Sequence, residues 1–277
     1  MRGFRAMQSG AALWLLATTL AAAPAGAQST PDGSTLRPVL AATGLKVPPT
    51  EIEIGYSRET LSNNLPDWTS SYLLGTHRFG ERKTLYGGLR KTRRFGLDDT
   101  EAHAGLYYPV GETWTSLVEA SASPTHEVLA HYSAYGQMQK NLPGGWGLGL
   151  GLRHNEYSLT GTNVLSAFAE RYWGNFRGAY TLYSGRPEGA SSAASHRFQL
   201  NYYYAARNSV GLSYSNGREV EYLGPPRGVL TSDVKNWTLS GQHWLAPDWA
   251  LTYDVVNHEQ GSLYRRQGLR LGLRHSF

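Results

Sequence analysis

Apolar side chains recur at every second position through most of the chain after residue 50. Residues 146–153 place Trp146, Leu148, Leu150 and Leu152 on one face, and glycines with Arg153 on the other. A period of two predicts a β-strand with one apolar and one polar face. The same alternation runs through residues 51–57, 101–108, 197–204, 249–256 and 268–274, whereas residues 68–79 and 162–172 alternate poorly and their faces stay unassigned.

Connections of two kinds separate the predicted strands. Tight turns begin at residues 80, 109, 142, 173, 206 and 246, and usually longer, polar loops begin at residues 62, 95, 123, 158, 186, 217 and 258. The two kinds alternate strictly, which predicts antiparallel strands with both ends of the series on the tight-turn side. The series gives about fourteen strands, with twelve as the alternative count, and each has roughly the 9–11 residues that a tilted strand needs to cross a bilayer.

Alternation alone does not decide which face lies inside. A secreted two-sheet sandwich would bury its apolar face, whereas a membrane barrel turns that face toward lipid. A ring of this many strands is too wide for side chains to fill, and charges on its polar face need contact with water. We therefore predict an all-β, closed, antiparallel up-and-down transmembrane β-barrel over residues 50–277, and keep the sandwich as the alternative.

The last stretch of the chain is predicted to close this barrel. In lipid an unpaired backbone group costs several kcal/mol, so the first strand must pair with the last. The final strand would turn Leu269, Leu271, Leu273 and Phe277 toward lipid, and Arg270 and Arg274 toward the lumen.

The N-terminus resembles a targeting segment. Arg2 and Arg5 precede an apolar run over residues 11–23, and small residues Ala25 and Ala27 precede Gln28. This order predicts a signal peptide over residues 1–27 that is cleaved on export. The alternative, a membrane anchor, requires a longer apolar run. Residues 28–49 mix Pro, Ser, Thr and Gly without a period and are interpreted as a periplasmic linker. Export of a membrane barrel predicts that the protein lies in the outer membrane of a Gram-negative bacterium.

Composition narrows the class of protein further. The 277 residues are 40% apolar, yet they include 18 Tyr, 8 Trp and 32 Gly, which suits a β-protein with tight turns. The absence of Cys excludes a disulfide scaffold and a thiolate metal site. A formal charge of +5 without a basic cluster gives no reason to expect nucleic acid as a partner.

The polar faces of the predicted strands carry many charges. The candidates for lining the lumen are Arg90, Arg94, Glu101, Glu119, Arg153, Arg177, Arg197, Asp254, Arg270 and Arg274. With Glu53, which shares this predicted face, seven arginines stand against four carboxylates, which predicts a mildly positive, mixed interior. Such arginines would bias a pore toward anionic or polyhydroxylated solutes, or they would pair with carboxylates of adjacent strands and brace the wall. Both interpretations stay open.

Aromatic residues cluster beside the predicted turns, as in the interfacial girdles of membrane barrels. The membrane-interface candidates are Trp114, Trp146, Trp173, Trp244 and Trp249.

Several stretches resemble one known family. "RRFGLDDTEAHAGLYYPVGETW", "REVEYLGPPRGV", "HWLAPDWALTYD" and "YRRQGLRLGLRHSF" are similar to the YaiO family of outer-membrane β-barrels, and the resemblance covers residues 50–277. It implies an association with surface polysaccharide production. The final Phe, with apolar residues at alternate positions, also resembles the sorting signal that barrel assembly machinery reads; His275 departs from that signal.

No catalytic motif of the GxSxG, HExxH or Walker type is present. His131 with Ser133, and His103 with Glu101, share a predicted face, as chance allows in such a chain. We expect no enzyme activity, no cofactor and no metal, with a barrel-wall lipid hydrolase as the remote alternative. Residues 216–233 are predicted to be the longest loop, one that either folds into the barrel mouth or lies on the surface.

The prediction for function is a passive conduit or accessory for surface- or polysaccharide-related solutes, with a non-catalytic structural barrel as the alternative. The expected partners are outer-membrane lipid and the barrel assembly machinery, and saccharides or anionic solutes are further candidates.

Overall fold

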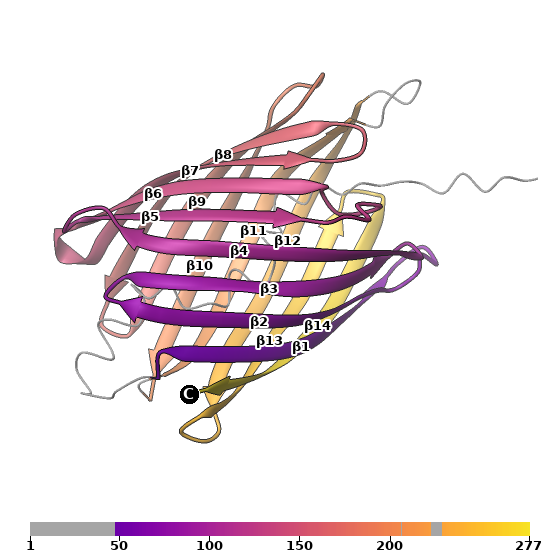
Figure 1. Ribbon diagram of the computed structural model, residues 1–277. Coiled ribbons are helices and arrows are strands. Elements are labelled where there is room, and N and C mark those ends of the chain that lie inside the picture. Colours follow the sequence, from indigo (N-terminus) through magenta and orange to yellow (C-terminus); the bar gives the residue numbers. More distant parts are fainter. Residues whose placement is uncertain (1–47, 206, 223–228) are drawn as a thin grey trace, which may run out of the picture.

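The structure, a computed structural model, describes residues 48–205, 207–222 and 229–277. They form fourteen antiparallel strands and one 3-10 turn, η1 (Pro143–Gly145). The strands are β1 (Thr50–Leu61), β2 (Trp68–Gly80), β3 (Lys83–Arg94), β4 (Leu97–Pro109), β5 (Trp114–Ala122), β6 (Tyr132–Leu142), β7 (Trp146–Glu156), β8 (Gly161–Trp173), β9 (Phe176–Pro187), β10 (Ala193–Tyr204), β11 (Asn208–Tyr222), β12 (Val229–Trp244), β13 (Trp249–Gln260) and β14 (Tyr264–Ser276). Each strand pairs with its neighbours in chain order, and the sheet closes into a barrel (Figure 1). The predicted fold and the count of fourteen are confirmed.

Closure occurs between β1 and β14, as predicted. The register runs from Glu51 opposite Ser276 to Leu61 opposite Arg266. At the turn end, Thr50 and Phe277 exchange backbone hydrogen bonds of 3.2 and 2.9 Å. The backbone groups of both strands therefore find partners without water, which lipid requires.

The tight turns lie at the end of the barrel that carries the C-terminus, and the predicted loops lie at the other end (Figure 1). The loop predicted at residue 95 is a two-residue turn between Arg94 and Leu97. The turn η1 places Gly144 at a φ of 74° and Gly145 at 76°, in the left-handed region that glycine tolerates best. The predicted signal peptide, residues 1–27, and residues 28–47 of the predicted linker lie outside the described residues.

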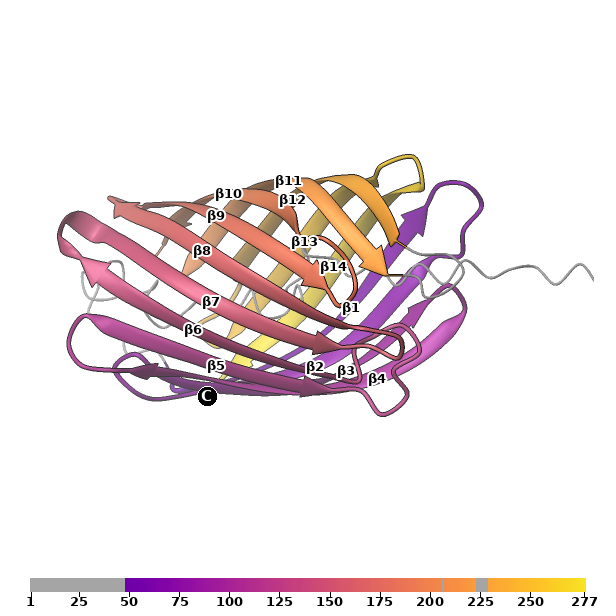
Figure 2. The same cartoon turned by 90° about the horizontal axis from the view of Figure 1, so that it is seen from above.

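The two faces of the sheet differ sharply. Leu150 and Leu152 are 62% and 56% exposed, whereas Arg274 is 2% exposed. The apolar side chains therefore point outward and the charged ones inward, along strands that tilt strongly around the barrel (Figure 2).

The two poorly alternating strands, β2 and β8, place apolar residues on the inner face. In β2, Trp68 packs against Tyr264, and Leu74 packs with Tyr86 and Leu117. In β8, Phe168 lies over Gly149, where a Cβ would come within 2.2 Å of the ring. These inward apolar residues break the simple pattern, and for Phe168 a glycine on the neighbouring strand makes the room.

Residues 216–233 differ from the predicted loop. β11 continues to Tyr222 and β12 begins at Val229, and their register runs without interruption from Asn216 opposite Lys235 to Tyr222 opposite Val229. The segment is therefore mainly a strand hairpin, because Val, Tyr, Leu and Thr continue the pairing beyond the polar residues. Residues 223–228 lie outside the described residues, so folding into the barrel mouth stays a prediction.

Candidate functional site on the inner face of the barrel

Residues that stand opposite one another in adjacent strands share a face, so the registers define the inner face around the ring. All ten residues named as lumen candidates stand at inward positions. Glu53, for example, faces Arg274 across the closing strand pair, and Arg90 faces Glu101 across β3 and β4.

Glu53 is the centre of a network on the inner faces of β13, β14, β1 and β2, here called the charged wall. It is 2% exposed and accepts hydrogen bonds from Arg274 at 2.8 Å, Arg270 at 3.1 Å, Tyr72 at 2.5 Å and Thr252 at 2.9 Å. Arg270 also pairs with Asp254. A buried carboxylate with this many donors is stable as a charge, and it holds four strands together.

The charged wall extends toward the turn end through Glu51. This carboxylate pairs with Arg78 at 3.1 Å, with Arg274 at 3.3 Å and with Arg207 at 3.4 Å. Arg207 belongs to the turn between β10 and β11, and its guanidinium stacks 3.1 Å from the ring centroid of Trp244. Burial lowers the pKa of Arg207, and Glu51 opposes that effect. The turn is thus fastened to the first strand across the turn-end opening.

Further pairs brace the strands from β3 to β9. Arg90 pairs with Glu101 at 2.9 Å, and Arg153 pairs with Glu119 at 2.8 Å. Tyr86 donates to Glu119 at 2.6 Å. Next to them, Arg177 pairs with Glu170 at 2.7 Å, and Gln139 donates to the same carboxylate at 2.6 Å. The bracing interpretation therefore describes five of the predicted arginines: Arg90, Arg153, Arg177, Arg270 and Arg274.

Two arginines of the predicted set have other surroundings. Arg94 lies 4.6 Å from the ring centroid of Trp68, and Arg266 covers the same indole at 4.8 Å. Arg266 also pairs with Glu59. Arg197 is buried on β10 and takes part in interactions within the chain.

The charges of the inner face balance more closely than the sequence indicates. The inward arginines of the described strands are Arg78, Arg90, Arg94, Arg153, Arg177, Arg197, Arg266, Arg270 and Arg274, and the inward carboxylates are Glu51, Glu53, Glu59, Asp99, Glu101, Glu119, Glu170, Glu219 and Asp254. Among the residues whose side chains the structure describes, the two sets are equal in number, so the interior is close to balanced and not mildly positive as the sequence predicts. Glu170 is missing from the predicted lumen residues, because its strand alternates too poorly to reveal which face the residue occupies.

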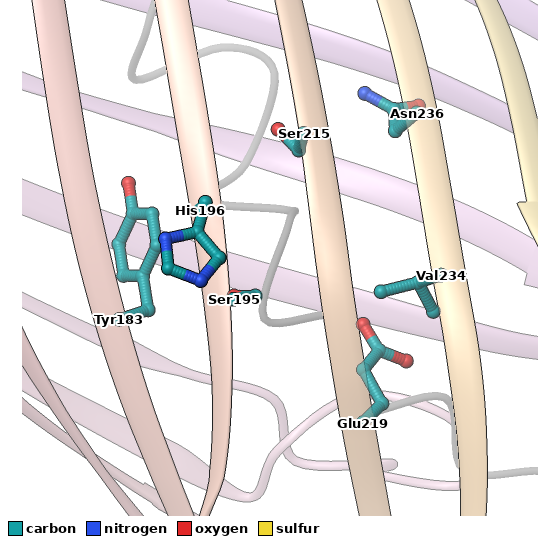
Figure 3. A pocket seen from close by; sticks show the side chains of 7 residues that line it. All are labelled: Tyr183, Ser195, His196, Ser215, Glu219, Val234 and Asn236. Atoms are coloured by element: carbon teal, nitrogen blue, oxygen red, sulfur yellow. The ribbon is translucent and has the colours of Figure 1, made fainter.

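The inner faces of β10, β11 and β12, here called the neutral wall, are built differently. They present hydroxyl and amide side chains: Ser195, Gln199, Asn201, Ser213, Ser215, Ser232, Asn236, Thr238, Ser240 and Gln242. Among the described side chains of this wall, Arg197 and Glu219 are the charged ones. A recess lies on this wall, lined by Tyr183 of β9 together with Ser195, Ser215 and Asn236 (Figure 3).

The loop between β5 and β6 is latched to the inner face at the loop end. The carboxylate of Asp99 on β4 accepts backbone N–H groups from Glu127 at 2.9 Å, Val128 at 2.7 Å and Leu129 at 2.8 Å. Asp99 is 1% exposed and points inward, so this loop lies against the inner side of the wall. In the next loop, burial raises the pKa of Tyr157 to about 12, which keeps its phenol neutral.

Aromatic residues cover the outer face at the turn end. Trp114, Trp146, Trp173 and Trp249 are each more than a third exposed and point outward, beside the turns. Lys140 lies 5.4 Å from the ring of Trp114, and Arg171 lies 5.2 Å from that of Trp146. This arrangement suits a membrane interface, where an apolar ring and a basic group meet polar headgroups.

Trp244 does not share this placement. It stands opposite the fully buried Ala250, so its indole points inward beneath Arg207. The prediction of an interface position for Trp244 is corrected, because its distance from the turn is right but its place in the alternation puts it on the inner face.

Neither residue pair considered for catalysis is joined by a hydrogen bond among the described residues. Ser133 accepts a hydrogen bond from Arg153 at 3.1 Å, and the ring of His131 stacks on His126 with centroids 4.5 Å apart. Glu101 pairs with Arg90, while both ring nitrogens of the adjacent His103 are buried without a hydrogen bond to any described residue. Within the described ranges, no three His, Asp or Glu side chains are placed to hold a metal ion. No helix in the described part of the chain is long and apolar enough to cross a membrane.

A closed antiparallel ring with an apolar outer face and a charged inner face defines an outer-membrane β-barrel. The sequence matches the model of the YaiO membrane beta barrel domain over residues 49–221, more than half of the chain, and the protein belongs to this family. The resemblance seen in the sequence is thereby confirmed.

Solved structures support the fold alone. A bacterial polysaccharide outer membrane secretin superposes with a TM-score of 0.54 at 8% identity, over 84% of this chain and 100% of that one. The outer membrane protein Omp33 of Acinetobacter baumannii gives a TM-score of 0.51 at 11% identity, with the same coverage of both chains. The OmpF porin of Salmonella typhi gives 0.50 at 8% identity, over 82% and 97% of the two chains. Comparison with curated proteins finds no match.

Proposed function

We propose that this barrel is a passive conduit or accessory for surface- or polysaccharide-related hydrophilic solutes. The observation that carries the proposal is the division of its faces. Apolar side chains meet lipid, and the inner face is mainly polar, apart from the inward clusters of Trp68 with Tyr264 and of Leu74 with Tyr86 and Leu117. Polar groups and charge rings that line a membrane barrel set which solutes enter it.

The proposal includes export with removal of residues 1–27, contact with outer-membrane lipid, and insertion by barrel assembly machinery. It also holds that the barrel is not an enzyme, because the Ser, His and Glu side chains considered for catalysis are engaged elsewhere or unpaired with one another. Anionic solutes are less favoured than the sequence suggests, since the inward arginines are matched by carboxylates.

A structural barrel without transport is the second candidate, and the Glu53 network favours it because it stiffens the wall. Planar-bilayer recording of the mature chain, residues 28–277, separates the two. We expect stepwise conductance with weak ion selectivity, as the balanced charges require. Insertion verified by heat-dependent mobility in SDS gels, but without any conductance, would exclude the conduit and leave the structural role.

A further inference from the structure

We infer that the neutral wall, together with Tyr183, is the solute-contacting surface of the barrel and takes uncharged, polyhydroxylated solutes of the oligosaccharide class. The inference rests on the proposed conduit function and adds to it the place of contact and the class of solute.

The first argument is which polar groups remain available. Around Glu53 most donors and acceptors of the charged wall are engaged with one another, and Nη2 of Arg270 is buried without a hydrogen bond to any described residue. On the neutral wall, Gln199, Ser213 and Ser215 make no side-chain hydrogen bond to any residue that the structure describes. Asn236 uses one amide hydrogen to reach Thr238 at 3.1 Å and has further capacity. Groups without partners in the protein are the ones that a solute can engage.

The second argument is exposure. Glu53, Arg274 and Thr252 of the charged wall are each 2% exposed or less. Gln199 and Asn236, in contrast, are half-buried at inward positions, so part of each amide borders the interior space. Ser195, Ser213 and Ser215 of the neutral wall are themselves buried, at 5%, 8% and 7% exposed, so the accessible groups of this wall are its half-buried residues, such as these two amides.

The third argument is the shape and chemistry of the recess. Figure 3 shows Tyr183, Ser195, Ser215 and Asn236 on four consecutive strands around one small hollow, which Glu219 and Val234 also line. Sites for small polar ligands combine an aromatic or apolar surface with a few placed hydroxyls and amides. Tyr183 supplies the aromatic face, and the three polar residues supply groups that both donate and accept, as sugar hydroxyls do.

The fourth argument excludes an anionic preference. An anionic solute needs cations that the protein has not already neutralised. Arg177, next to the neutral wall, pairs with Glu170, and Arg197 on the wall itself is engaged within the chain. A neutral solute exchanges hydrogen bonds with this wall without disrupting any ion pair.

The test is block of single-channel current by two probes of equal length, neutral maltohexaose and a charged oligouronate. Maltohexaose should block the intact barrel at lower concentration. The variant Gln199→Ala/Asn236→Ala should raise its half-blocking concentration about 3- to 10-fold, the effect of losing one or two hydrogen bonds to a neutral ligand. Gln137→Ala is the matched control, because Gln137 is an inward, half-buried glutamine on β6, outside the neutral wall.

The possible results separate the two levels of the proposal. Equal effects of both variants, or stronger block by the oligouronate, would overturn the inference while the conduit stands. Conductance without any block by maltohexaose would do the same, and it needs no variant. Absence of conductance from an inserted barrel would overturn the conduit and this inference together.

Discussion

The charged wall and the neutral wall arise from the same alternating sequence pattern, yet they use their polarity for different ends. Around Glu53, two arginines, a tyrosine and a threonine converge on one carboxylate. Along β10 to β12, side chains such as Gln199 and Ser213 find no side-chain partner among the described residues. In the charged wall the polar side chains hydrogen-bond to one another, whereas in the neutral wall such side chains keep hydrogen-bonding capacity toward the interior of the barrel.

This difference has a physical origin in side-chain type. Guanidinium and carboxylate groups that lose water must be paired, because an isolated charge in a low dielectric is costly. Hydroxyls and amides tolerate partial solvation at much lower cost. A strand rich in Ser, Thr and Asn can therefore face an interior space without closing it, whereas Arg and Glu pull adjacent strands together.

The largest effect is expected on removing the centre of the charged wall. Glu53→Ala leaves Arg270 and Arg274 buried with fewer acceptors, and breaking such a buried cluster costs about 3–5 kcal/mol. Urea unfolding in detergent micelles, followed by tryptophan fluorescence, should show a strongly lowered midpoint. Glu53→Gln keeps the shape of the side chain and one acceptor oxygen. Its urea midpoint should lie between that of Glu53→Ala and that of the intact protein. A midpoint unchanged in Glu53→Ala would mean that the network does not brace the barrel.

A second, smaller effect concerns the glycines that make room for inward rings. A Cβ at Gly55 would lie 2.3 Å from the ring of Tyr72, which donates to Glu53. Gly55→Ala must displace this ring, and such overpacking costs roughly 1–3 kcal/mol. Gly136→Ala on β6 is the control, because nothing lies within 4 Å of its added Cβ. Equal stability of the two variants in the same urea assay would contradict the close packing at Tyr72.

The third prediction concerns the latch at the loop end. Asp99→Asn replaces a charged acceptor of three backbone N–H groups by an amide and should release the loop that follows β5, at a cost of about 1–3 kcal/mol. Limited proteolysis by a glutamate-specific protease, which cuts after Glu127, should then proceed faster. Asp98→Asn, one residue away, removes only an exposed ion pair with Arg93 and should leave cleavage unchanged. Similar cleavage rates in both variants would argue against the latch.

Much of the fold could be predicted from the sequence, because turn spacing and period-two alternation are local signals. β7 and β14 show them cleanly, and closure between the first and last strands follows from the chemistry of lipid. β2 and β8 concealed their faces because Trp68 and Phe168 point inward, Trp68 against Tyr264 of β14 and Phe168 over Gly149 of β7. Alternation within one strand does not report such neighbours.

For the candidate site, the sequence predicted which face of the sheet each side chain occupies, but not which residues it contacts. The sequence placed Arg270 and Arg274 toward the lumen, but the stagger of the barrel decides that both reach Glu53. The predicted interface position of Trp244 was wrong for a related reason, since one step in the alternation separates the lipid face from the inner face. The neutral wall has no pattern of charged residues that could be recognised in the sequence. Only the strand register shows that its hydroxyl and amide side chains share the inner face.

The smallest effect on stability is expected for a substitution on the neutral wall, and a stability close to that of the intact protein is itself informative. Ser213 is 8% exposed, and Ser213→Ala removes a hydroxyl that makes no hydrogen bond with a described residue, so the free energy of unfolding should change by no more than the roughly 0.5 kcal/mol that a weak hydrogen bond contributes. The urea midpoint of this variant should match that of the intact protein within error. A side chain that is polar, inward and dispensable for stability is available for contact with solute, whereas a loss as large as that of Glu53→Ala would show that the two walls do the same structural work.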